Sequence, residues 1–271
     1  MTTLTARPQV NFTTRMTRDA PAFTGLGLFI AISALPLIAA SLLDPREFLN
    51  APVWQKPLQF HLALSTYILT LAFFARFLPQ GMAPRRWRIY ATVVCFCIVA
   101  ELLWVGGAAA FGTASHFNTA NPVMAALYGL MGVFAVILTS PSLVMGIAIA
   151  RNPNTGLAPA LRLSIVLGLI LTFLLTLIAA GTMSSGTGHL ISTPTTHASV
   201  PILGWSREVG DLRTAHFFAT HALHALPLIG FAASRLLPPS SARTAIWISA
   251  AAYTALVAFT MAQAFQGRPF L

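Results

Sequence analysis

The stretch LSIVLGLILTFLLTLIAAGTMSSGT, residues 163–187, contains no Asp, Glu, Lys or Arg. A helix rises about 1.5 Å per residue, so about twenty apolar residues cross a hydrocarbon layer about 30 Å thick. A helix also satisfies its backbone hydrogen bonds internally, as a segment in lipid must. The stretch therefore predicts a transmembrane helix.

Six further segments share this length and this near absence of charge: 22–43, 57–75, 89–112, 122–150, 214–234 and 244–266. Of the 271 residues, 56% are hydrophobic and 8% are charged, against about 25% charged in soluble domains. This composition excludes an ordinary soluble enzyme. The sequence predicts an all-α polytopic membrane protein with one seven-helix domain over 22–266, between tails of residues 1–21 and 267–271.

The positive charges indicate the orientation in the membrane. The net charge is +10, but the basic residues are scattered among the predicted loops, so we expect no nucleic-acid partner. With the N-terminus inside, eleven basic residues fall on the cytoplasmic side: Arg7, Arg15, Arg18, Arg76, Arg85, Arg86, Arg88, Arg151, Arg162, Arg235 and Arg243. Five fall outside: Arg46, Lys56, Arg207, Arg213 and Arg268. Cytoplasmic loops carry an excess of Lys and Arg, so we expect a cytoplasmic N-terminus and an extracytoplasmic C-terminus in the bacterial cytoplasmic (inner) membrane.

The first segment also permits a second interpretation. Arg7, Arg15 and Arg18 resemble the basic start of a signal peptide, with cleavage after Ala39-Ala40 as the alternative. The apolar run is too long for a typical signal peptide, so we expect a retained anchor.

Several familiar chemistries lack their motifs. The chain has no P-loop, no dinucleotide fingerprint, no nucleophile elbow and no Cys-x-x-Cys pair. Its single lysine, Lys56, lies just before the second segment, which excludes a retinal Schiff base in the last one. Functional residues are therefore sought among the few polar side chains within the apolar segments.

All seven histidines fall on the predicted outer side or near the midplane: His61, His116, His189, His197, His216, His221 and His224. Three of them descend segment 214–234, where a rotation of about 100° per residue places them in one broad sector. Pro227 follows and removes one helical hydrogen bond, which predicts a kink and a free carbonyl beside His224.

Glu101 is the only carboxylate inside any predicted segment. A charge at such depth is costly and is a functional hypothesis by default. Its expected partner is His221 or His224. The alternative is a protonated Glu101 that bonds a neighbouring helix.

Imidazole and carboxylate groups bind zinc, iron, copper or haem iron. The sequence predicts haem b or a single transition metal as cofactor, with these candidate ligands: His61, His216, His221, His224 and Glu101. Gly106 and Gly107 offer space for a flat macrocycle, or simply close helix packing. Stacked haems need histidines about four turns apart on one helix, a spacing absent here, which disfavours a transmembrane electron wire.

The outer segment of about residues 188–213 is long and rich in Ser, Thr, Gly and Pro. Such loops are usually lids, so we expect one over the histidines, with a disordered loop as the alternative. Asp211 is expected to cap the next helix, with Arg213 as an ion partner of a nearby carboxylate. In the functional alternative, Asp211 acts at the outer mouth.

Two segments, NAPVWQKP (residues 50–57) and GWSREVGDLRTAHF (residues 204–217), resemble segments of uncharacterised bacterial multi-pass membrane proteins. The resemblance implies a seven-span membrane protein and no particular activity.

These observations predict a haem- or metal-dependent redox protein or enzyme with an outward-facing pocket of histidines and Glu101, acting on a lipophilic substrate such as a quinone or a lipid. One alternative is a proton-linked transporter or small-ligand sensor. The other is metal-free acid catalysis on a lipid or isoprenoid by Glu101 and Asp211, with pKa values separated by burial.

Overall fold

The computed structural model describes residues 12–119 and 121–271. Seven helices are long and apolar enough to cross a membrane, which confirms the predicted fold class. They are α2 (Pro21–Leu43), α3 (Gln55–Phe74), α4 (Arg85–Ala110), α5 (Pro122–Arg151), α6 (Pro159–Ser184), α7 (Leu212–Leu236) and α8 (Pro239–Phe265). Residues 1–11 of the predicted N-terminal tail, with Arg7, lie outside the described residues.

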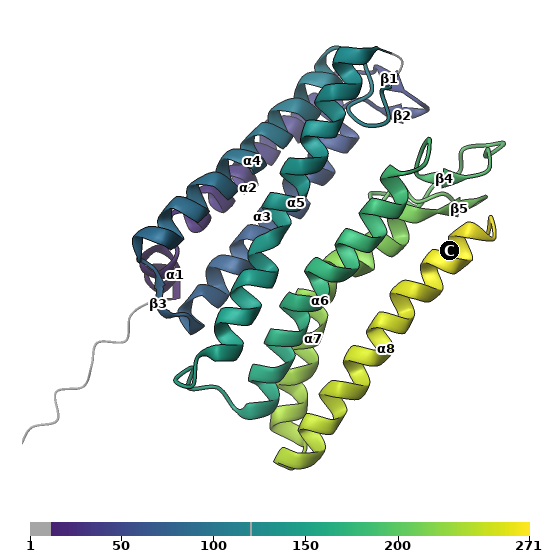
Figure 1. The fold of residues 1–271 in the computed structure, drawn as a ribbon. Coiled ribbons are helices and arrows are strands. Elements are labelled where there is room, and N and C mark those ends of the chain that lie inside the picture. The colour runs from purple at the N-terminus through teal and green to yellow at the C-terminus, as the bar shows by residue number, and fades with distance from the viewer. Residues whose placement is uncertain (1–11, 120) are drawn as a thin grey trace, which may run out of the picture.

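Short elements mark the two ends of the bundle: α1 (Phe12–Asp19), β1 (Glu47–Phe48), β2 (Ala51–Pro52), η1 (Ala75–Phe77), β3 (Pro79–Met82), β4 (Leu190–Ile191) and β5 (Gly210–Asp211). β1 pairs with β2 and β4 pairs with β5, both antiparallel. Figure 1 shows these four strands at one end, here called the loop end, and α1 at the other, the α1 end.

The helices form two groups of consecutive elements. Helices α2 to α5 pack together, as do α6 to α8, and α5 packs along α6 to join the groups (Figure 1). The most extensive contact in the molecule is that between α6 and α7. The space between α3 and α7, which belong to different groups, holds the candidate site.

Several of these helices begin at residues that favour a helix N-terminus. Pro21, Pro122, Pro159 and Pro239 each occupy the first turn, where proline has no intrahelical hydrogen bond to lose. Asn121 caps α5 by accepting a hydrogen bond from the Val123 amide at 2.8 Å.

The outward faces of the helices are apolar. Phe29 and Ile32 of α2 are 67% and 65% exposed, and many other large hydrophobic side chains are also exposed on the outside of the bundle. A soluble monomer rarely exposes contiguous apolar surface on this scale. These faces contact the hydrocarbon of a lipid bilayer.

α6 and α7 approach each other closely at Pro227. A Cβ atom added at Gly168 of α6 would lie 2.9 Å from the Ala222 carbonyl oxygen and 3.1 Å from the Pro227 ring. The Leu223 amide donates to the Thr172 hydroxyl of α6 at 2.8 Å. Glycine at position 168 therefore allows α6 to meet α7 closely at Pro227, which lies inside a helix that is continuous from Leu212 to Leu236.

Candidate functional site

A chain of hydrogen bonds connects α3 and α7 near the middle of the bundle. The Nδ1 atoms of His221 and His224 lie 3.0 Å apart. The Nε2 atom of His224 lies 3.0 Å from the Thr70 hydroxyl of α3. Thr70 in turn donates to the Thr66 carbonyl oxygen at 2.7 Å. This group is called the histidine relay below and consists of Thr70, His221 and His224.

The partners of Thr70 fix the proton positions in the neutral relay. A hydroxyl has one proton, and Thr70 donates it to the Thr66 carbonyl, so Thr70 accepts from the Nε2–H of His224. Neutral His224 then presents an unprotonated Nδ1, which accepts from the Nδ1–H of His221. The Nε2 atom of His221 is left as a lone-pair acceptor. The hydrogen bonds of the neutral relay therefore all run in one direction, from His221 to His224 to Thr70, and the free acceptor is Nε2 of His221.

A cavity of about 350 Å³ lies beside the relay, on the side of the α1 end. Its lining combines four phenylalanine rings, five aliphatic side chains and two polar groups: Phe73, Phe74, Phe77, Phe231, Leu161, Ile165, Leu223, Pro227, Leu228, Thr70 and His224. The cavity is thus apolar except where the relay borders it. Its volume lies within the range of about 300–1,000 Å³ typical of small-molecule sites.

Polar side chains gather on the other side of the relay, toward the loop end. This polar cluster consists of Lys56, Glu101, His116, His189, Arg213 and His216, and it draws on both helix groups. The charge of Lys56 acts on His116, His189 and Glu101, and that of Arg213 acts on His189. Lys56 and Arg213, from the N-terminal ends of α3 and α7, carry like charges that repel each other, and Glu101 is the carboxylate that attracts Lys56.

Burial keeps the two loop histidines of the polar cluster neutral. The ring of His116 packs against Phe60 of α3 and Tyr128 of α5, with centroid distances of 5.8 and 5.7 Å. Burial, assisted by the positive charge of Lys56, lowers the pKa of His116 to about 3. Burial and the charge of Arg213 lower the pKa of His189 to about 4, although Asp211 opposes this shift.

Glu101 is 4% exposed. Its Oε2 atom is buried and has no hydrogen-bond partner within the described part of the chain. The predicted pairing with His221 or His224 is not found among the described hydrogen bonds and ion pairs, and Lys56 is the cation that acts on Glu101. Glu101 therefore belongs to the polar cluster and keeps an open hydrogen-bonding position.

His61 lies apart from the other candidate ligands. It is nine positions from Thr70 on α3, which at about 100° per residue places the two on opposite faces of the helix. Thr70 faces α7, whereas His61 lines a groove between α2, α3 and α4. The structure therefore brings His221 and His224 together but does not place His61 with His216.

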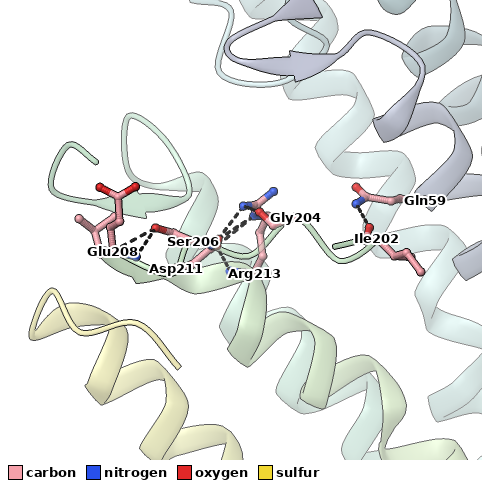
Figure 2. A network of polar contacts seen from close by, with 8 residues as sticks. Gln59, Ile202, Gly204, Ser206, Glu208, Asp211 and Arg213 are labelled. Atoms are coloured by element: carbon pink, nitrogen blue, oxygen red, sulfur yellow. Dashed lines mark hydrogen bonds and ion pairs between the residues drawn. The ribbon is translucent and has the colours of Figure 1, made fainter. Parts of the chain in front are cut away.

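The long loop, residues 185–211, includes β4 and β5. Hydrogen bonds and an ion pair to Asp211 hold its last part in place. Asp211 is 3% exposed. It accepts from the amides of Ser206 and Arg213, both at 3.0 Å, and forms an ion pair with the Arg213 guanidinium at 2.6 Å. Arg213 also donates to the Gly204 carbonyl oxygen (Figure 2). The predicted helix cap and ion pair are both confirmed, and they occupy Asp211 with structural contacts.

Two further contacts shape this loop. Glu208 accepts hydrogen bonds from the amides of Thr195, Thr196 and Ala198 and from the hydroxyls of both threonines. These bonds hold its pKa well below the usual range. Gln59 of α3 donates to the Ile202 carbonyl oxygen at 2.6 Å, so the loop that precedes α7 is tied to the other helix group (Figure 2). The loop thus spans both groups at the loop end.

Sequence reasoning did not identify Thr70, Gln59 or Lys56 as site residues. Thr70 has no special neighbour in the sequence, and threonine is common in membrane helices. Lys56 offered the better signal, because it is the only lysine of the chain and lies beside an apolar segment. Its role emerges only when α3 and α7 are placed next to each other.

Comparison of the chain with protein-family models, with curated proteins and with solved structures found no match. Within residues 12–119 and 121–271, no three His, Cys, Asp or Glu side chains lie close enough together to hold a metal ion. The predicted haem or metal cofactor stays a prediction.

Acidification is expected to destabilise the protein through His116 and His189. Their folded-state pKa values of about 3 and 4 lie below the ordinary value of 6.5, so the unfolded chain binds more protons between these pH values. Stability therefore falls as the pH drops below 6.5, by up to about 1.4 kcal/mol per pH unit for each histidine. Thermal unfolding in detergent from pH 7.5 to 5 measures the slope.

The variant His189→Gln should reduce this pH slope. His197→Gln, which changes an exposed histidine of the same loop, is the matched control. Stability that stays constant or rises on acidification would contradict the prediction.

Proposed function

We propose that the protein is a proton-linked transporter of a small lipophilic molecule, in which the histidine relay separates two compartments. The supporting observation is the position of the relay. It borders the apolar cavity on one side, and the polar cluster lies on its other side. In this proposal, a molecule that crosses from the apolar cavity to the polar cluster passes the contact between Thr70 and His224.

The cavity suggests the chemistry of the transported molecule. Phenylalanine rings favour an aromatic or aliphatic body, while Thr70 and His224 offer hydrogen bonds at one end only. Ligand sites commonly combine apolar walls with a few polar groups that fix the orientation. The expected substrate is a lipophilic molecule with one hydrogen-bonding group, taken from the bilayer.

The hydrogen bonds of the relay also provide a path for a proton from His221 through His224 to the substrate. A proton taken up at Nε2 of His221 allows the Nδ1 proton of His221 to pass to Nδ1 of His224. His224 then releases its Nε2 proton to the hydrogen-bonding group of the substrate. One proton enters and one leaves, and imidazole exchanges protons readily near neutral pH.

The division into two helix groups supports a movement that opens the relay. Transport by rocking of one helix bundle against another is common among membrane carriers. Here the packing of α5 along α6 joins the groups, whereas Thr70 to His224 is the hydrogen bond between α3 and α7 among the described residues. Separation of α3 from α7 would break that bond and join the compartments.

The redox alternative requires several ligands on one cofactor. His221 and His224 direct their Nδ1 atoms at each other, and His61 lies on the other face of α3. The arrangement therefore favours a relay over a shared metal. An absorption spectrum of the oxidised and reduced protein, with its metal content, tests the redox alternative directly.

Proton flux tests the transport proposal. The full-length protein is reconstituted into liposomes that contain the pH indicator pyranine, and the decay of an imposed pH gradient is followed with valinomycin and potassium to collapse the potential. We expect His221→Phe and His224→Phe to slow the protein-dependent flux at least tenfold, because each interrupts the relay. His197→Phe, on the exposed loop, should match the wild type. Wild-type flux equal to that of empty liposomes, or full flux in both relay variants, would overturn the proposal.

A further inference from the structure

A second cavity, independent of the relay, lies between α2, α3 and α4. Its volume is about 280 Å³, and it is lined by apolar side chains of α2 and α4, by Gly106 and Gly107, and by His61 and Ser33 as its polar groups. His61 begins the second turn of α3 and the two glycines lie in the last turn of α4, so the groove lies in the half of the bundle toward the loop end. It is called the His61 groove below.

The hydrogen bonds of His61 define what it offers to a ligand. Its Nδ1 atom lies 2.8 Å from the Pro57 carbonyl oxygen. A carbonyl can only accept, so the imidazole carries its proton on Nδ1 and donates it there. In the neutral imidazole the Nε2 atom is therefore left with a lone pair, and it has no hydrogen-bond partner within the described residues. The hydrogen bond to Pro57 thus fixes the tautomer of His61 and leaves Nε2 as an acceptor.

Ser33, on the α2 side of the groove, is also an acceptor. Its hydroxyl donates to the Ile30 carbonyl oxygen at 2.9 Å, which uses its only proton and leaves lone pairs. Both polar groups of the groove therefore accept, and neither has a proton to give. A ligand with a carbonyl or ether oxygen would gain no hydrogen bond, whereas a ligand with a hydroxyl group would satisfy an acceptor.

The shape of the groove favours a flat ring. A Cβ atom added at Gly106 or Gly107 would meet nothing within 4 Å, so the glycines leave open space instead of packing against another helix. Phe29 and Leu103 are 67% and 72% exposed and line the same groove. The volume is at the small end of ligand sites, which suits a ring system better than a whole lipid.

From these observations we infer that the His61 groove binds a lipophilic aromatic molecule through a hydroxyl group, a phenol or a quinol, which enters from the bilayer and donates to Nε2 of His61. Packing of the ring against Phe29 and Leu103 replaces its contacts with lipid chains and orients it in the groove. The hydroxyl bond supplies the selectivity for the reduced, proton-bearing form of such molecules over the carbonyl or ether form. The inference does not depend on the transport proposal, because the groove and the relay lie on opposite faces of α3.

A matched pair of probes tests this selectivity. The intact protein in lipid nanodiscs is dialysed to equilibrium against 2-naphthol and, separately, against 2-methoxynaphthalene, whose ring is the same but whose oxygen cannot donate. Empty nanodiscs measure partition into lipid. One hydrogen bond made away from water is worth about a tenfold change in affinity, so we expect the wild type to bind 2-naphthol about tenfold more tightly than its methyl ether.

Two variants assign the site. His61→Phe should bring the ratio of the two dissociation constants close to one, while His197→Phe should leave it at the wild-type value. Gly107→Leu should weaken both probes by filling the groove with His61 still present, and it keeps the test decisive if His61→Phe does not fold. A ratio of one in the wild type overturns the inference. So does a ratio that is lost in His224→Phe and kept in His61→Phe, which would place the probe beside the relay.

Discussion

Asp211→Ala is expected to lower the unfolding free energy by about 2–4 kcal/mol and to release the long loop. The carboxylate is buried and holds four groups at once: the amides of Ser206 and Arg213, and the Nε and Nη2 groups of the Arg213 side chain. Removal of one partner from a buried ion pair typically costs about 3–5 kcal/mol. The Arg213 side chain is 31% exposed, so water recovers part of that loss.

The chain contains its own control for this prediction. Asp44 pairs with Arg46 at the same spacing of two residues, with 22% of its side chain exposed against 1% for Asp211. Asp44→Ala should therefore destabilise less. Unfolding by sodium dodecyl sulfate in mixed micelles, followed by tryptophan fluorescence, compares the two, because Trp205 is buried in the same loop. Equal losses in the two variants would show that burial of Asp211 is not what matters.

Gly168→Leu is the second substitution with a large expected effect, about 3 kcal/mol of destabilisation. The new side chain would meet the Ala222 carbonyl oxygen, the Pro227 ring and the Leu223 Cα atom. These atoms belong to the backbone or to a proline ring and cannot rotate away as a flexible side chain can. The helices α6 and α7 must therefore separate. Because α7 also holds His221 and His224, the same variant should slow proton flux in liposomes.

Gly181→Leu is the matched control, because it lies on the same helix and its added Cβ would meet nothing within 4 Å. It should be neutral or slightly stabilising, since leucine favours a helix more than glycine does. Comparison of the two variants by the same unfolding titration separates the close contact from any general effect of a glycine replacement in α6. Similar stabilities of the two variants would refute the packing explanation.

The sequence predicted the depth of each residue better than its direction. The seven spans and the cap at Asp211 follow from composition and local chemistry. Depth follows from the rise of about 1.5 Å per residue. The rotation of a helix about its axis does not, because a membrane helix that is apolar all round has no polar face to orient it. For this reason His61 was grouped with His216, although it faces the opposite side of α3.

The polar partners were harder to predict for a related reason. Glu101 was expected to pair with His221 or His224, but no such bond is found among the described residues, and Lys56 at the start of α3 is the cation whose charge acts on it. The order of the long loop depends on Glu208, whose five hydrogen-bond donors come from residues ten to thirteen positions earlier. Loop composition alone carries no sign of such a contact.

The division into two groups of consecutive helices has a consequence for biogenesis. Every helix of the first group is synthesised before the first residue of α6, so α2 to α4 can begin their mutual contacts while the later helices are still being made. Helices α6 to α8 then assemble around the close approach at Gly168. The contact of α6 with α5 and the hydrogen bond from Gln59 to the long loop join the later helices to the earlier ones. The contact between Thr70 and His224 joins residues 154 positions apart, so the relay can form only after most of the chain, α7 included, has been made.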